Sequence, residues 1–381
     1  MLVDDMPDGG INMGKRKVKT GDLKPGMISA NDVYTFNDQL IIQEGTQLTE
    51  RIITRLKFYA VTEIAIESDE DDIIPDYVDL TPVIFSYDKP YREQVMATPE
   101  FKRFHASYTS ALENISESLN DIAMGKRSPV QDELLDVTGS VLKHVRNNLH
   151  LFDMLNCMYD SSDIIYTHSL NVALTARALG IWLGLSDADL DVLTCAGLLH
   201  DIGKLLVPQE ILNKPGSLTP QEYSIVKNHA TFGYNLLKDQ ANLDPRIKRA
   251  VLMHHERCDG SGYPVGLHRT AIDDFARILG IADVYDAMSS KRSYREAYCP
   301  FAIMDMFERD GLEKYDPEYI LTFRTGVVET YLHNNVVLND GREGEVVLIN
   351  KLSLSRPVIR LKDNTYVNLE KKHELYIKKV I

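Results

Sequence analysis

The sequence lacks the features that mark several common classes of protein. Its 381 residues include four cysteines with no C-x-x-C pair among them, so neither a disulfide framework nor a thiolate zinc site is indicated. No run of 18 apolar residues is present, and no membrane-spanning helix is therefore predicted. The first residues also lack the basic and apolar regions of a signal peptide, so we expect the chain in the cytoplasm.

Basic residues are scarce relative to acidic ones. The chain has 42 lysines and arginines against 56 aspartates and glutamates, and the net charge of −14 at pH 7 argues against nonspecific binding of nucleic acid. Half of that charge comes from residues 67–79, where seven acidic residues occur without a basic one. The rest of the chain is only mildly acidic, so its composition is still compatible with a small anionic ligand.

Histidine and aspartate are the residues that stand out in the middle of the chain. Four histidines and two aspartates lie on or beside predicted helices there, and His168 lies one helix upstream. These residues are His200, Asp201, His229, His254, His255 and Asp283. Imidazole nitrogen and carboxylate oxygen together suit iron, manganese, zinc or cobalt better than calcium or magnesium.

The adjacent pair His200 and Asp201 is the most informative of these. A carboxylate can bridge two metal ions while the neighbouring histidine completes the shell of one of them. Two ions about 3.5–4 Å apart can hold a hydroxide between them and clamp the attacking and leaving oxygens of a phosphodiester. The spacing therefore indicates phosphoryl hydrolysis.

Three motifs in this stretch follow one another in a familiar order: His200-Asp201 with Gly203-Lys204, then His254-His255, then Gly262-Tyr263-Pro264. In them the sequence resembles the HD-GYP family of metal-dependent phosphohydrolases over roughly residues 150–325. The resemblance implies an enzyme that opens the bacterial second messenger cyclic di-GMP to linear pGpG, with onward cleavage to GMP left open. A cyclic di-GMP sensor with little turnover, or a hydrolase of another cyclic or ordinary nucleotide, are the alternatives.

The resemblance also implies a metal-ligand set and a set of substrate contacts. One metal would be surrounded by His168, His200, Asp201 and Asp283, and the other by Asp201, His229, His254 and His255. The catalytic residues would be Asp201 and Lys204, whose ammonium would face the scissile phosphate. The substrate contacts would be Lys204, Gly262, Tyr263, Pro264, Arg292 and Arg295.

The predicted number of metals rests on one position near the first ligand, His168, where this sequence differs from some members of the family. Some family members hold a third ion with a glutamate four residues before the first histidine, where this chain has Ile164. On a helix Asp163 would be rotated about 140° from His168, and Asp160 would lie two turns away, so neither replaces that carboxylate. We predict two divalent ions, iron as first choice and manganese as second.

The predicted fold is mainly α, with an all-helical HD-type catalytic core between a small α/β N-terminal module and a small β-rich C-terminal module. The expected divisions are a flexible arm (1–15), the α/β module (16–68), an acidic linker (69–97), connecting helices (98–150), the HD-GYP catalytic domain (151–330) and the β-rich module (331–381). The connecting helices could also support a homodimer. In the core, the capping box that begins at Thr219 predicts the helix that carries His229.

Overall fold

The structure is a computed structural model of the chain. It describes residues 14–34, 40–49, 52, 53, 56, 61, 63–68, 91–158, 164–290 and 297–381. The chain divides into two compact units, residues 1–84 and residues 85–381. None of the described helices combines the length and the apolar character that a membrane crossing requires.

The first unit contains two antiparallel strand pairs. β1 (Gly14–Lys19) pairs with β4 (Glu63–Ser68), and β2 (Val33–Tyr34) pairs with β3 (Leu40–Ile42). A single 3-10 turn, η1 (Thr20–Asp22), follows β1. Its small apolar core consists of Leu23, Val33, Ile41, Ile42, Leu48, Ile53, Leu56, Ile64 and Ile66. β1 starts within the segment predicted as an arm, while most of the acidic linker lies outside the described residues.

The second unit is mainly helical, which confirms the predicted fold class. Its helices are α2 (Tyr91–Ala97), α3 (Pro99–Ala123), α4 (Gln131–Leu142), α5 (Asn148–Met158), α6 (Ile164–Trp182), α7 (Asp187–Leu199), α8 (Gln209–Leu212), α9 (Pro220–Lys227), α10 (His229–Leu237), α11 (Pro245–Met253), α12 (Asp274–Ser289), α13 (Pro300–Lys314) and α14 (Pro317–Glu329). Two 3-10 turns, η2 (Ile202–Leu206) and η3 (Arg269–Ala271), join them. α2 lies within the stretch that was predicted as a linker.

Helix α3 belongs to the core of this unit. Thr98 caps its first turn by accepting a hydrogen bond from the amide of Phe101, and Pro99 occupies the first helical position. Its buried residues recur every three or four positions, which places them on one face: Phe101, Phe104, Tyr108, Ala111, Ile115, Leu119 and Ile122. That face packs into the same apolar cluster as α6 and α12.

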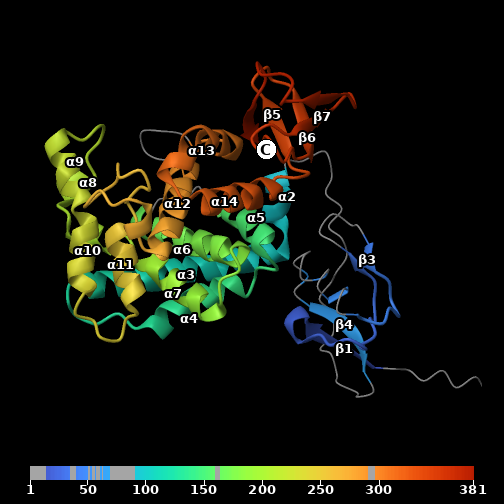
Figure 1. Cartoon of the computed structure of the whole chain (residues 1–381), viewed down its shortest axis with the longest axis horizontal. Coiled ribbons are helices and arrows are strands. Elements are labelled where there is room, and N and C mark those ends of the chain that lie inside the picture. The colour runs from blue at the N-terminus through green and yellow to red at the C-terminus, as the bar shows by residue number, and fades with distance from the viewer. Residues whose placement is uncertain are drawn as a thin grey trace, which may run out of the picture. The chain divides into compact units, whose positions relative to one another are not determined.

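Helices α6, α7, α11 and α12 pack on one another, and η2 packs on α10 (Figure 1). The predicted helix from Thr219 to His229 is divided in two, because α9 ends at Lys227 and α10 begins at His229. The capping box at Thr219 is present, as predicted. His229 therefore opens a new helix and does not continue the one before it.

The C-terminal residues form a five-stranded antiparallel sheet, as predicted. Its order is β8 (Tyr366–Asn368), β7 (Val358–Leu361), β6 (Glu343–Leu348), β5 (Asn335–Leu338) and β9 (Ile377–Val380). Gly341, with φ of 90°, turns the chain between β5 and β6. The sheet lies beside α13 and α14, at the end of the unit away from α8–α10 (Figure 1). Val336, Leu338 and Val346 join the apolar cluster of the helices, so the sheet shares their core.

Candidate metal centre

The seven predicted metal ligands come together from separate helices. His168 lies on α6, His200 ends α7, Asp201 precedes η2, His229 opens α10, His254 and His255 follow α11, and Asp283 lies on α12. They form two groups: Asp201, His229, His254 and His255, and His168, His200 and Asp283. Within each group the candidate ligand atoms lie within 4.8 Å of one another. Each group could hold a metal ion.

Glycines allow the helices to come this close. A Cβ on Gly203 would lie 1.9 Å from the carbonyl oxygen of His229, so only glycine permits η2 to pack against the start of α10. A Cβ on Gly197 would lie 2.5 Å from Cα of Ala173, and its absence lets α7 approach α6. The glycine of the His-Asp-x-Gly-Lys motif therefore brings Asp201 and His229 together.

The two oxygens of Asp201 face different ligand groups. Oδ1 lies 3.2 Å from Nε2 of His229 and 3.8 Å from Nε2 of His254. Oδ2 lies 3.2 Å from Nε2 of His200 and 3.5 Å from Nε2 of His168. A carboxylate placed in this way is able to bridge two cations.

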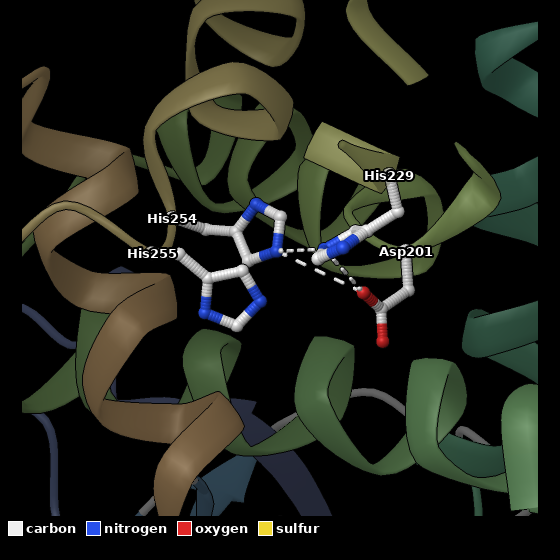
Figure 2. A group of neighbouring side chains, drawn as sticks. All are labelled: Asp201, His229, His254 and His255. Atoms are coloured by element: carbon white, nitrogen blue, oxygen red, sulfur yellow. Dashed lines mark hydrogen bonds and ion pairs between the residues drawn. The ribbon is translucent and has the colours of Figure 1, made fainter. Parts of the chain in front are cut away.

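The separations between ligand atoms are those of atoms that share a cation. His229 and His254 point their Nε2 atoms at each other 3.3 Å apart, beside the Asp201 carboxylate (Figure 2). Nε2 of His168 lies 3.0 Å from Oδ1 of Asp283. Metal bonds of about 2.1 Å place neighbouring ligand atoms about 3.0–3.4 Å apart. The arrangement thus leaves room for cations between the ligands.

Three of the histidines are oriented by a backbone carbonyl three residues before them. Nδ1 of His200 donates to the carbonyl of Gly197 at 2.7 Å, and Nδ1 of His229 donates to that of Val226 at 2.7 Å. Nδ1 of His254 donates to a carbonyl three residues back at 2.8 Å. Because a carbonyl accepts only, each Nδ1 carries the proton and each Nε2 presents its lone pair to the centre.

Two buried polar atoms at the centre lack a hydrogen bond. Among the described residues, Nε2 of His200 and Oδ1 of Asp201 have no hydrogen-bond partner, although both residues are almost fully buried. A buried polar atom without a partner costs about 1–3 kcal/mol of folding free energy. A divalent cation would satisfy both atoms, so the residues present fit the metals that HD-type phosphohydrolases hold.

The charge states of Asp201, His254 and His255 also favour a cation. Burial would raise the pKa of Asp201, but the neighbouring His200 and the Lys204 ammonium hold it well below its usual range. Burial lowers the pKa of His254 to about 4 and that of His255 well below its usual value. The carboxylate is therefore ionised and these two imidazoles are neutral at pH 7, which is the state that binds metal.

Lys204 lies at the edge of the centre. Its Nζ forms an ion pair with Oδ2 of Asp201, and its side chain is 23% exposed. The Lys204 side chain therefore contacts the buried carboxylate and is also partly exposed to solvent.

A chain of buried hydrogen bonds supports His168. Its Nδ1 donates to Oδ2 of Asp286 at 2.7 Å, and Asn171 donates to the other oxygen of Asp286 at 2.9 Å. The hydroxyl of Tyr108 on α3 donates to Oδ1 of Asn171 at 2.6 Å. Asp286 follows Asp283 by three residues, so helical spacing could have placed it on the same face. Nothing in the sequence linked Tyr108 to the centre.

The Gly262-Tyr263-Pro264 loop is tied to the ligand pair His254-His255. Glu256 accepts hydrogen bonds from the amides of Val265 and Leu267, both at 2.8 Å, and from that of Gly266 at 3.0 Å. The role of Glu256 was not predicted, because its partners come from a loop about ten residues away.

Gly262 and Tyr263 complete the attachment of this loop. A Cβ on Gly262 would lie 2.4 Å from the amide nitrogen of Arg257, so the loop packs tightly on backbone there. The ring of Tyr263 stacks on that of His255, with centroids 4.6 Å apart. These contacts fix Tyr263 beside the metal ligands.

The remaining predicted contacts fall outside the described part of the chain. Arg292 and Arg295 lie there, as do Asp160 and Asp163, and the side chain of Ile164 is also outside it. Their predicted roles stay predictions.

Comparison with known proteins places the chain in a family. Residues 150–319 match the family described as HD domain, which agrees with the helical core and its paired histidine and aspartate ligands. The chain is 31% identical to the cyclic di-GMP phosphodiesterase PA4108 of Pseudomonas aeruginosa over 91% of its own length and 84% of that protein. The chain belongs to the HD-GYP family of metal-dependent phosphodiesterases within the HD-domain class.

Two further relatives match over a smaller part of the chain. The cyclic di-GMP phosphodiesterase response regulator RpfG of Xanthomonas campestris is 40% identical over 36% of this chain and 37% of its own length. The 3'3'-cGAMP-specific phosphodiesterase 2 of Vibrio cholerae is 31% identical over 50% of this chain and 40% of its own length. The chain thus spans well under half of the length of these two relatives.

Proposed function

We propose that the chain hydrolyses cyclic di-GMP, opening one phosphodiester bond to give linear pGpG. The observation that carries the proposal is the position of Asp201, whose two oxygens face two groups of metal-ligating side chains. The substrate is supported by the names of the relatives from Pseudomonas aeruginosa and Xanthomonas campestris, which are cyclic di-GMP phosphodiesterases.

We infer that the chain holds two divalent ions, most readily iron and otherwise manganese. His168, His200 and Asp283 would hold one ion, and His229, His254 and His255 the other, with Asp201 shared between them. When bound, such ions lower the pKa of coordinated water toward 7 and polarise phosphoryl oxygens. The nitrogen-rich shell suits iron and manganese better than it suits calcium or magnesium.

The residues around the ligands would position the substrate. Lys204 would exchange its ion pair with Asp201 for a contact with the scissile phosphate and stabilise negative charge there. Tyr263 would meet the nucleotide from its fixed place beside His255. Gly262 and Pro264 shape the loop that presents it, and Arg292 and Arg295 would add phosphate contacts.

A substrate panel tests the proposal. The purified chain, loaded anaerobically with Fe(II) or Mn(II), is incubated with cyclic di-GMP, 3'3'-cGAMP and cyclic di-AMP, and products are separated by chromatography. We expect pGpG from cyclic di-GMP at the highest rate. Cleavage of 3'3'-cGAMP alone would show that 3'3'-cGAMP, and not cyclic di-GMP, is the substrate. Tight binding of cyclic di-GMP without product would indicate a sensor.

The same preparations test the metal count. Elemental analysis of the anaerobically purified chain should give two ions per chain. A third tightly bound ion would contradict the two-metal site.

A further inference from the structure

One face of helix α9 carries an aromatic ring and a cation toward the metal centre. Tyr223 and Lys227 are four residues apart on α9, so they share a face of the helix. Nζ of Lys227 lies 5.3 Å from the centre of the Tyr223 ring. α9 leads directly into α10, whose first residue is the ligand His229 (Figure 1).

Lys227 also contacts the loop on the other side of the centre. Its Nζ lies 5.8 Å from the centre of the Tyr263 ring, and Tyr263 in turn stacks on His255. Lys227 therefore contacts the Tyr263 ring of the loop as well as the Tyr223 ring of its own helix. His255, Tyr263, Lys227 and Tyr223 therefore form a continuous row that leads outward from the metal ligands.

The polar groups of this row are free to meet a ligand. Among the described residues, Lys227 has no carboxylate partner, and the hydroxyls of Tyr223 and Tyr263 form no hydrogen bond. Tyr223 is 49% exposed. In a chain with a net charge of −14, an unpaired ammonium beside the metal centre is available to an anion.

From this row we infer that Tyr223 and Lys227 form a nucleotide subsite next to the metal centre. The Tyr223 ring would stack on a purine base, and Lys227 would contact the phosphate that is not being cleaved. The inference rests on the proposed function, because a cyclic dinucleotide with one phosphate at the metals must place its second phosphate and its bases outside them. Base stacking on a tyrosine is tolerant of base identity, so the subsite favours nucleotides as a class.

The test compares a substrate that has bases with one that has none. We measure kcat/KM for cyclic di-GMP and for bis(p-nitrophenyl) phosphate with the manganese-loaded full chain, and take their ratio. Tyr223→Ala and Lys227→Met should each lower the ratio about tenfold, and Tyr223→Phe, which keeps the ring, should lower it less than threefold. Tyr366→Ala, at an exposed position on β8, is the matched control and should leave the ratio at the wild-type value.

Ratios within twofold of wild type for both Tyr223→Ala and Lys227→Met would overturn the subsite. If the wild type cleaves bis(p-nitrophenyl) phosphate but no cyclic dinucleotide, the proposed function fails, and the subsite is then judged by binding. Equilibrium titration of the manganese-loaded chain with GMP needs no turnover. Binding weakened about tenfold by Tyr223→Ala supports the subsite, whereas equal binding, or none by the wild type, excludes it.

Discussion

At the scale of single residues, Asp201 has the largest influence on the centre. Each of its oxygens faces a different ligand group, and its carboxylate is almost fully buried. A change at this position therefore acts on both proposed metal sites, whereas a change at His168 or His255 acts first on one. Metal content and reaction rate in variants of these residues measure this difference.

Asp201→Ala should abolish tight metal retention and hydrolysis together, with a rate loss of at least about 10³-fold, because both of the proposed ions would lose a ligand. Elemental analysis and a product assay measure the two effects. Asp191→Ala is the control, since Asp191 lies on the preceding helix α7 and forms a partly exposed ion pair with Arg177. Full metal content with a normal rate in Asp201→Ala would remove this residue from the site.

Lys204→Ala should keep the metal content but slow turnover about 10²-fold, because the ammonium is proposed to stabilise charge and not to bind metal. Lys362→Ala, which removes an exposed lysine paired with Glu343 in the C-terminal sheet, is the matched control. Loss of metal from Lys204→Ala, or a rate within threefold of wild type, would contradict the assignment.

At the scale of elements, α3 contributes to the centre although it lies outside the residues that match the HD domain. Its Tyr108 supports Asn171, Asn171 supports Asp286, and Asp286 orients His168. Mutation of a residue that hydrogen-bonds to a metal ligand typically lowers metal affinity by 10- to 100-fold. The helix is thus expected to affect metal binding without touching a metal.

Tyr108→Phe should weaken binding of one of the two metals about tenfold, because it leaves Oδ1 of Asn171 buried without its donor. Metal titration at limiting concentration measures this, and thermal unfolding reports the accompanying loss of stability. Tyr285→Phe is the control. It also removes a buried hydroxyl, which lies on the same helix as Asp286 but near Tyr331 and away from the ligands. If both variants bind metal equally well, the chain from Tyr108 has no part in the centre.

The sequence was most informative where chemistry and local pattern coincide. The histidines and aspartates were identifiable because their residue types are rare in apolar helices and occur as adjacent pairs. Tyr108, Asn171 and Glu256 were missed because each resembles an ordinary helical or loop residue and gains its role only through a partner far along the chain. The break between α9 and α10 was missed because no proline or glycine marks it.

At the scale of the whole molecule, the two flanking modules differ in their relation to the catalytic core. Residues 1–84 form a compact unit with their own apolar cluster. The C-terminal sheet buries Val336, Leu338 and Ile359 in the cluster that contains the helices. Removing the sheet would expose this apolar surface to water. Each Å² of apolar surface exposed would cost about 25 cal/mol of folding free energy.

A chain of residues 85–381 should therefore fold, bind metal and unfold at a temperature close to that of the full chain. A chain of residues 85–334 should unfold at a clearly lower temperature or aggregate, because the core loses its cover. Circular dichroism melts and metal analysis of both fragments provide the test. Equal melting temperatures for the two would show that the sheet is dispensable.

The hydrogen bonds from His200, His229 and His254 to carbonyls three residues back have a consequence for metal exchange. Each ring is held by the backbone just before it, so the rings are already aimed before an ion arrives. Little conformational entropy then remains to be lost on binding. One ion should replace another without rearrangement of the helices, and the metal that occupies the centre in a cell would follow which metal is abundant there.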